Sequence, residues 1–416
     1  MSKKFSNIRK QFPDNINSST NNIIPTTKTF HRFTEISEEN LEKLIISGNS
    51  KSCSSDPAPT SLIKDSLPVL LPVLHSIVNK SLQSSVMPID LKNAVVTPIL
   101  KKAQDKENLM NYRPVSNLPY LGKLIERVAV KQIDTHLTDE NLHEPLQSAY
   151  RSHHSTETAL VKVSNDILLA LDQRKCVYLV LLDLSAAFDT IDHNVFLARL
   201  ENENGVTGEA LKWMSSYLSD RKQCIKIDST LSDNRDISFG FPQGSLIGPF
   251  GFKIYTKPLT EIAHKHNINI HLYADDTQLY TSFDPQNSED AMNRLEACIE
   301  EIRVWMTQNF LKLNDKKTEF IIFGTEIDVA KVTEWTVTVG DTVILPSKSV
   351  RNIGVIMDSE FSLDNQISDK IRSCYSQLYS LSKIRKYLTF DTTKTLVHAL
   401  VTSRLDNLNS LLINSL

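Results

Sequence analysis

The sequence feature that most constrains the fold is an almost unbroken apolar run, CVYLVLLDL at 176–184, in which Asp183 is the only charge. A strand that is covered on both faces has this composition, because neither face has to meet water. We therefore predict a central strand in a layered domain. A chain of 416 residues is long for one ordinary core, so we also expect two or three lobes.

A second pattern, INIHLYADDTQLYTSF at 268–283, alternates apolar and polar residues on both sides of Asp275 and Asp276. This alternation predicts a hairpin with two carboxylates at its turn. An apolar stripe over 288–306 predicts an amphipathic helix, and FIIFG at 320–324 predicts another strand. This order of strands and helices indicates an α+β domain with helices on one face of the sheet.

The flanking segments have shorter patterns. The first 30 residues are rich in Asn, Ser, Thr and Lys, and we expect them to be disordered. The remaining predictions are a helix over 38–47 capped by Ser37, a strand over 94–100 leading into Lys101 and Lys102, an extended loop over 111–119, a helix over 121–140, and mostly helix over 368–412.

The composition excludes some classes of protein. Net charge is -3, from 46 basic and 49 acidic residues, so global charge gives no support for nucleic-acid binding, which would need local basic patches. Five scattered cysteines without a C-x-x-C pair predict free thiols and no zinc site. There is no secretory signal, and the apolar stretch 67–78 is too short for a membrane span. We expect a soluble intracellular protein.

The residues most relevant to chemistry are Asp183, Asp275 and Asp276. Carboxylates at the ends of buried strands are costly unless they meet water or a cation. Three of them on adjacent strands have the oxygen ligands that Mg²⁺ prefers. From these residues alone, solvated turn aspartates are the alternative. His153 and His154 are adjacent and would point apart, so we do not expect them to bind a metal.

Eight ordered motifs resemble those of one family, over roughly residues 30–416. In chain order they are VVTPILKK at 95–102, NYRPVSNLP at 111–119, QSAYRSHHSTETAL at 147–160, LLDLSAAFDTIDH at 181–193, GFPQGSLIGP at 240–249, YADDTQLY at 273–280, LNDKKTEFIIFG at 313–324 and VRNIGVIMD at 350–358. They resemble the reverse transcriptase of non-LTR retrotransposons, particularly the jockey-like and chicken-repeat groups. LVHALVTSRLDNLNSLL at 396–412 resembles the start of that family's thumb.

The resemblance implies an α+β right-hand polymerase with fingers, a palm of antiparallel sheet and packed helices, and a partial helical thumb. The implied division is a disordered segment at 1–30, a helical extension at 31–84, fingers at 85–175, the palm at 176–344, and the palm end with an incomplete thumb at 345–416. The implied partners are an RNA template, a DNA primer and deoxynucleoside triphosphates, with no membrane.

The resemblance also implies catalytic roles. Asp183 and Asp275 match the principal ligands of two Mg²⁺ ions, for which Mn²⁺ can substitute, and Asp276 matches the third carboxylate. Lys317 matches a lysine proposed to protonate the leaving pyrophosphate. A plain surface lysine is the alternative for Lys317.

Other residues match substrate contacts of the family. Phe188 matches the aromatic residue that excludes a 2′-hydroxyl, with a core phenylalanine as the alternative. Gln243 and Gly244 match a turn that touches the incoming nucleotide or the template. Arg113 matches a triphosphate contact, with Lys101 assisting, and each is otherwise a surface cation. Basic thumb residues are expected to contact the nucleic-acid backbone, namely Lys383, Arg385 and Lys386.

The sequence departs from the family pattern at several positions. Phe241 stands where the family usually has a small or valine-like residue, and Gly251 and Lys253 fall in a helix that is usually apolar. Ser152 and His153 stand where the family has Pro and Gly. The resemblance further implies that an upstream endonuclease domain and part of the thumb are missing. A truncated, inactive remnant that at most binds nucleic acid is therefore a second hypothesis, and another polymerase with the same palm is a third.

Overall fold

The structure is a computed structural model that describes residues 28–48, 53, 56–101, 106–108, 111–185 and 187–412, the last without the side chain of residue 187. Most of the segment 1–30, for which disorder is expected, lies outside the described residues. Lys102 also lies outside them. The chain divides into two compact units. The first comprises Met1–Glu144, Ala186–Lys257 and Met306–Lys312, and the second comprises Pro145–Ser185, Pro258–Trp305 and Leu313–Leu416.

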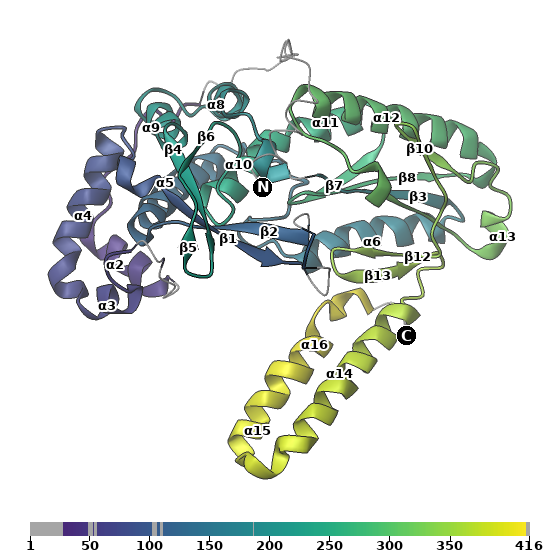
Figure 1. Ribbon diagram of the computed structural model, residues 1–416. Helices are drawn as coiled ribbons and strands as arrows, with labels where there is room; N and C mark the ends of the chain where they lie inside the picture. The colour runs from purple at the N-terminus through teal and green to yellow at the C-terminus, as the bar shows by residue number, and fades with distance from the viewer. Residues whose placement is uncertain are drawn as a thin grey trace. The chain divides into compact units, whose positions relative to one another are not determined.

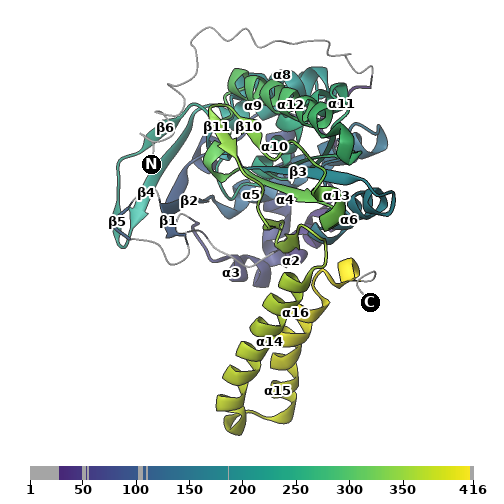
Figure 2. The same cartoon turned by 90° about the vertical axis from the view of Figure 1, so that its right-hand side faces the viewer.

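The first unit combines a mixed sheet with helices. Its helices are α2 (Glu38–Ser47), α3 (Thr60–Asp65), α4 (Leu67–Gln83), α5 (Tyr120–Asp139), α7 (Ala187–Thr190), α8 (His193–Asn202), α9 (Gly208–Leu218) and α10 (Ile247–Thr256). Its strands are β1 (Ala94–Leu100), β2 (Tyr112–Asn117), β4 (Arg221–Ile227), β5 (Thr230–Leu231) and β6 (Arg235–Ile237). The sheet runs β2-β1-β4-β5, with β6 also paired to β4 (Figure 2).

Strand β2 corrects the loop predicted over 111–119. It pairs antiparallel with β1, and Pro114 lies opposite Pro98. A proline cannot donate to a neighbouring strand, so two prolines argued for a loop. The strand is nevertheless possible because β2 is at one end of the sheet order, where only one side needs a ladder.

The second unit contains the predicted central strand. Its strands are β3 (Cys176–Leu182), β7 (Asn269–Tyr273), β8 (Asp276–Phe283), β9 (Glu319–Phe323), β10 (Val337–Val339), β11 (Thr342–Ile344), β12 (Ser349–Asn352) and β13 (Val355–Asp358). Its helices are α6 (Thr156–Asp172), α11 (Pro258–Lys265), most of α12 (Ser288–Gln308), α13 (Glu326–Val329), α14 (Asp364–Ile384), α15 (Phe390–Val397) and α16 (Ser403–Asp406).

The four-stranded sheet of this unit runs β7-β8-β3-β9 and is antiparallel throughout. All residues of β3 except Leu181 are buried, as the apolar run predicts. Helix α6 lies against one face, and α11 and α12 lie over the other (Figure 1). The expectation of helices on one face only was therefore wrong. A strand that is apolar at successive positions has to be covered on both faces.

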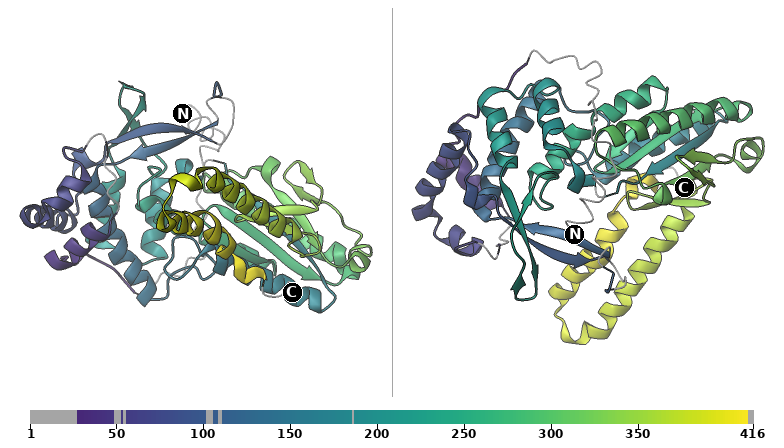
Figure 3. Two further views of the ribbon diagram at one scale, coloured as in Figure 1. Left: turned by 90° about the horizontal axis from the view of Figure 1, so that it is seen from below. Right: turned by 45° about the horizontal axis from the view of Figure 1, so that its top comes forward.

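The sequence predictions for two helical regions and for the cysteines are confirmed. Helix α2 begins after Ser37, whose hydroxyl accepts a hydrogen bond from the Asn40 amide at 3.3 Å. The helical pattern near the C-terminus becomes α14 alongside α15 and α16 (Figure 3). All five cysteines are free thiols. Among the described residues, no helix is both long and apolar enough to cross a membrane.

Candidate functional site

The second unit brings the three aspartates to one end of its sheet. Asp183 directly follows β3, and Asp276 is the first residue of β8, after Asp275 in the turn. Leu182 is paired with Thr277, so the end of β3 lies beside the start of β8. We call Tyr273–Asp276 the aspartate turn.

The aspartates repel one another. The pKa of Asp276 is raised to about 6, first by partial desolvation, although the residue is still exposed, and then by the negative charges of Asp275 and Asp183. A carboxylate with a raised pKa at the end of a sheet is typical of functional sites, although structural clusters also produce such shifts. A bound cation would relieve this repulsion.

Asp183 has two side-chain partners from the segment that precedes β9. The Asn314 amide nitrogen donates to its carboxylate at 2.9 Å, and the Lys317 ammonium lies 3.3 Å from the same oxygen. The backbone N–H of Asn314 also donates to the Asp183 carbonyl at 2.9 Å. The sequence argument named Lys317 but missed Asn314, although it lies in the same motif.

In their present conformations, the three carboxylates are not arranged as a complete metal site. Within the described part of the chain, no group of three His, Cys, Asp or Glu side chains is close enough to hold an ion. The donor set nonetheless fits a hard divalent cation, because it consists of carboxylate oxygens, and desolvation followed by the charges of its neighbours raises the pKa of Asp276.

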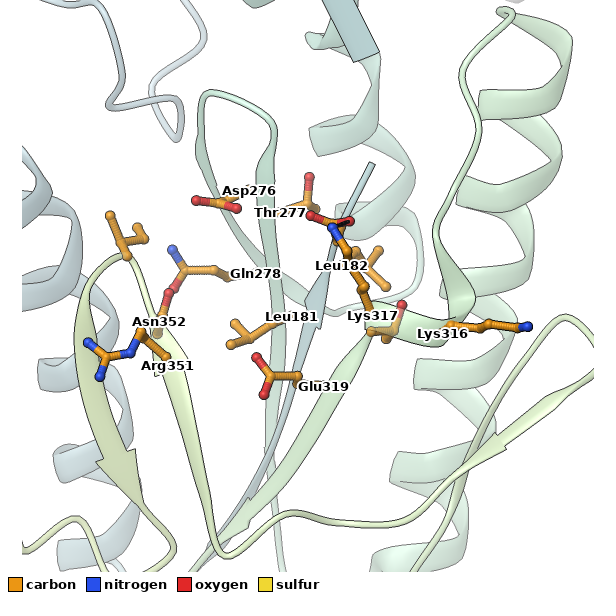
Figure 4. A pocket seen from close by; sticks show the side chains of 13 residues that line it. Leu181, Leu182, Asp276, Thr277, Gln278, Lys316, Lys317, Glu319, Arg351 and Asn352 are labelled. Carbon is orange, nitrogen blue, oxygen red and sulfur yellow. Dashed lines mark hydrogen bonds and ion pairs between the residues drawn. The ribbon is translucent and has the colours of Figure 1, made fainter. Parts of the chain in front are cut away.

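A polar cavity of about 470 Å³ adjoins this cluster (Figure 4). Lys317 points toward the end of β3 at Leu182, whereas Lys316 extends away from it (Figure 4). The residues that line the cavity are Leu181, Leu182, Asp183, Asp276, Thr277, Gln278, Lys316, Lys317, Thr318, Glu319, Arg351, Asn352 and Ile353. Both charge signs line this cavity, which suits a ligand with anionic groups and hydroxyls.

The first unit contains the turn with Gln243 and Gly244, for which the sequence predicts a substrate contact. We call Gly240–Gly244 the glycine turn. Two of its residues, Gly240 and Gly244, have φ of 78° and 116°, in the region that favours glycine. Backbone hydrogen bonds fix the turn from two sides. Ser116 N–H donates to the Gln243 carbonyl at 2.7 Å, and Phe241 N–H donates to the Phe188 carbonyl at 2.9 Å.

Gln243 also has a side-chain partner that sequence reasoning missed. Its amide nitrogen donates to the Asp189 carboxylate at 2.8 Å. Nothing in the sequence spacing links Asp189 to residue 243. Both residues line a cavity of about 230 Å³ in this unit. A carboxylate only accepts hydrogen bonds, so it fixes which end of the amide faces it.

The remaining substrate candidates lie in the same unit. The half-buried Phe188 ring packs on Phe252, with centroids 4.8 Å apart. Arg113 is exposed on β2 and lies opposite Ile99. Lys101 follows β1, and its backbone N–H donates to the Asn111 carbonyl at 2.8 Å. Arg113 and Lys101 therefore lie at the same end of the β1–β2 pair.

Two departures from the family pattern fit each other. A Cβ added at Gly251 in α10 would lie 2.5 Å from the ring of Phe241, which is buried. Only glycine leaves room for that ring. Lys253, on the same helix, has its ammonium 3.5 Å from Asp134. Ser245, two residues before α10, accepts a hydrogen bond from the Gly248 N–H at 2.9 Å.

Comparisons with known proteins agree with these observations. A family model described as reverse transcriptase (RNA-dependent DNA polymerase) matches residues 99–357. The probable RNA-directed DNA polymerase from transposon BS of Drosophila melanogaster is 26% identical over 313 residues, covering 74% of this chain and 34% of that protein. The RNA-directed DNA polymerase from mobile element jockey of Drosophila funebris is 25% identical over 327 residues, covering 76% and 34%.

The chain thus spans about a third of the length of these relatives. The jockey protein of Drosophila melanogaster is similar as well, with 24% identity over 305 residues, covering 72% of this chain and 32% of that protein. The matched family region includes both the aspartate turn and the glycine turn. The chain belongs to the reverse transcriptase (RNA-dependent DNA polymerase) family.

Proposed function

We propose that this chain is the RNA-directed DNA polymerase region of a non-LTR retrotransposon, which extends a DNA primer on an RNA template. The observation that carries the proposal is the cluster of Asp183, Asp275 and Asp276, in which desolvation, and then the charges of the other two carboxylates, raise the pKa of Asp276 to about 6. The cluster lies within the matched family region. We assign residues 85–175 to fingers, 176–344 to the palm, and 345–416 to the palm end and thumb.

The three aspartates would hold two Mg²⁺ ions, with Mn²⁺ as a substitute. Bound there, the ions supply charge neutralisation for an attacking primer 3′-hydroxyl and a departing pyrophosphate. The carboxylate oxygens of the three aspartates would hold the ions in position. The Lys317 ammonium would give a proton to an oxygen of the leaving pyrophosphate, and its 3.3 Å contact with Asp183 supports this role.

The first unit would bind the nucleotide. Gln243 and Gly244 would contact the incoming nucleotide or the template, and Phe188 would pack against a deoxyribose and disfavour a 2′-hydroxyl. Arg113 and Lys101 would contact the triphosphate through charge-assisted hydrogen bonds. Their common end of the β1–β2 pair supports a shared ligand.

The test is primer extension on an RNA template with Mg²⁺ and deoxynucleotides, comparing the wild type with Asp275→Asn. Asn keeps the size of the side chain and removes its charge. We expect DNA product from the wild type and none from the variant. Extension with ribonucleotides instead would favour the third hypothesis, another polymerase with the same palm. If the folded wild type makes no product, the chain is a remnant, and template binding becomes its remaining candidate activity.

A further inference from the structure

We propose that Gln147 is a positioning residue that holds the aspartate turn in the shape required for catalysis. The inference rests on the proposed function, because it concerns the backbone that carries Asp275 and Asp276. Nothing in the sequence motif around Gln147 assigns it a role. The argument comes from its burial and from the backbone groups that its amide contacts.

The Gln147 side chain contacts both backbone polar groups of Ala274. Its oxygen accepts from the Ala274 N–H at 3.1 Å, and its nitrogen lies 3.5 Å from the Ala274 carbonyl. The same oxygen accepts from the Ala149 N–H at 3.0 Å. Gln147 is only 2% exposed. A buried amide that pairs with one residue in two directions restrains the orientation of that residue.

Ala274 needs such restraint. Its φ is +57°, in the left-handed region, although it carries a Cβ. Two-residue hairpin turns favour Gly, Asn or Asp at positions with positive φ. Alanine has no polar side chain to stabilise the turn locally. The stabilising contact comes from Gln147 instead.

The backbone around Gln147 is itself anchored to β7. The Leu272 N–H donates to the Leu146 carbonyl at 2.9 Å, and the Ser148 N–H donates to the Leu272 carbonyl at 3.0 Å. Gln147 therefore bridges to Leu272 in parallel register. This anchor places the amide at a fixed distance from a turn that begins one residue later, at Tyr273.

The backbone of the aspartate turn decides where the carboxylates of Asp275 and Asp276 point. If Gln147 is lost, the Ala274 backbone loses both contacts and can leave the left-handed region. The carboxylates would then move relative to Asp183. A displacement of about 1 Å in such a site is enough to lower a rate about a hundredfold.

The experiment compares Gln147→Met with a matched control, Ser148→Ala. Met keeps the length of the side chain and removes its hydrogen bonds. Ser148 donates or accepts a 2.9 Å buried hydrogen bond with His271, so its loss weakens the same two segments without touching the turn. The measurements are melting temperature, primer-template affinity, KM and kcat in primer extension, and Mn²⁺ binding by calorimetry.

We expect both variants to melt at lower temperature and to bind primer-template normally. Gln147→Met should lower kcat about 10- to 100-fold and weaken Mn²⁺ binding, whereas Ser148→Ala should change neither by more than about threefold. Adding Ala274→Gly to Gln147→Met should recover part of kcat and of Mn²⁺ affinity. Glycine adopts positive φ without the strain that Gln147 offsets.

Equal loss of kcat in Gln147→Met and Ser148→Ala would overturn the inference, because it would mean a general structural role. A loss that Ala274→Gly does not relieve would overturn it too. If the wild type binds Mn²⁺ but extends no primer, the proposed function fails while calorimetry on the variants still tests Gln147. If the folded wild type binds no Mn²⁺, both proposals fail.

Discussion

The aspartate turn and the glycine turn both take the chain into the left-handed region, at Ala274 in one and at Gly240 and Gly244 in the other. The glycine turn does so with residues that have no side chain, and backbone groups fix it. The aspartate turn does so with an alanine, and a distant buried side chain holds it. The glycine turn is therefore sensitive to substitution at its own glycines, whereas the aspartate turn is sensitive to substitution of Gln147.

The space around the glycines makes this difference concrete. A Cβ at Gly244 would lie 2.8 Å from the Ser116 carbonyl oxygen, and one at Gly240 would lie 2.8 Å from that of Asp189. Backbone oxygens cannot move aside as a side chain would. In the aspartate turn the Cβ of Ala274 is already accommodated, so its vulnerability is conformational rather than steric.

The largest expected effect is that of Gly244→Ala. The new Cβ would meet the Ser116 carbonyl and would also be strained at a φ of 116°. We expect primer extension to fall at least about a hundredfold, because the Gln243 side chain would be displaced. Steady-state kinetics on the purified variant would measure the loss.

Gly354→Ala is the matched control for this prediction. Gly354 also has positive φ, at 92°, but nothing lies within 4 Å of its added Cβ. It should lose only about 1 kcal/mol of stability, from backbone strain alone. If both variants lose the same activity, steric contact at Gly244 is not the cause of the loss. The glycine turn would then not differ from the aspartate turn in its steric sensitivity.

A smaller effect is expected for the pair formed by Gln243 and Asp189. Gln243→Glu would set two carboxylates against each other where a 2.8 Å hydrogen bond now exists. We expect about a tenfold fall in kcat/KM for the nucleotide, or about 1.4 kcal/mol. Adding Asp189→Asn should restore most of it, because the donor and the acceptor are simply exchanged.

A double-mutant cycle with three variants measures this coupling. The individual changes are Gln243→Glu and Asp189→Asn, and the third variant carries both. Additive losses would mean that Asp189 does not orient Gln243. Recovery in the double variant would sharpen the contrast with the aspartate turn, where the orienting group acts on backbone rather than on a side chain.

A last prediction concerns stability rather than catalytic rate, namely a pH dependence of stability near the aspartate turn. Burial, and then Lys162, lower the pKa of His271 to about 4. The unfolded chain therefore binds a proton at higher pH than the folded one does. Stability from this group is complete above about pH 6.5 and is lost as pH falls towards 4.

Denaturant unfolding between pH 4 and 7.5 measures this dependence. We expect a decrease on the order of 1–3 kcal/mol over that interval, and a flatter profile for His271→Gln. His271 is on the strand that leads into the aspartate turn, and its buried partner is Ser148. An unchanged profile in the variant would assign the acid sensitivity to other groups.

Local patterns predicted most of the elements but few of the contacts that orient side chains. The apolar run of β3 and the Ser37 cap of α2 depend on neighbours in sequence, and both are confirmed. Strand β2 was missed because its prolines outweighed its position at the edge of the sheet. Pairing with another segment decides such cases, and periodicity carries no information about it.

In the candidate site, likewise, the motif residues could be predicted from the sequence but most of their contacts could not. The resemblance singled out Asp183, Asp275, Asp276 and Gln243 by their motifs. It did not single out Gln147, which contacts Ala274, or Asn314, which contacts Asp183, because these pairs are 127 and 131 positions apart in the sequence. Their types are common in loops, and only the fold reveals which backbone or carboxylate they meet.

The fit of Phe241 against Gly251 also limits the order in which such residues can be exchanged. A chain that begins with a larger residue at 251 can first acquire glycine, at a cost of about 1 kcal/mol in helix stability. The phenylalanine can then enter the space that the glycine leaves. The reverse order passes through an overpacked intermediate, so one mutational path between the two arrangements is open and the other is blocked.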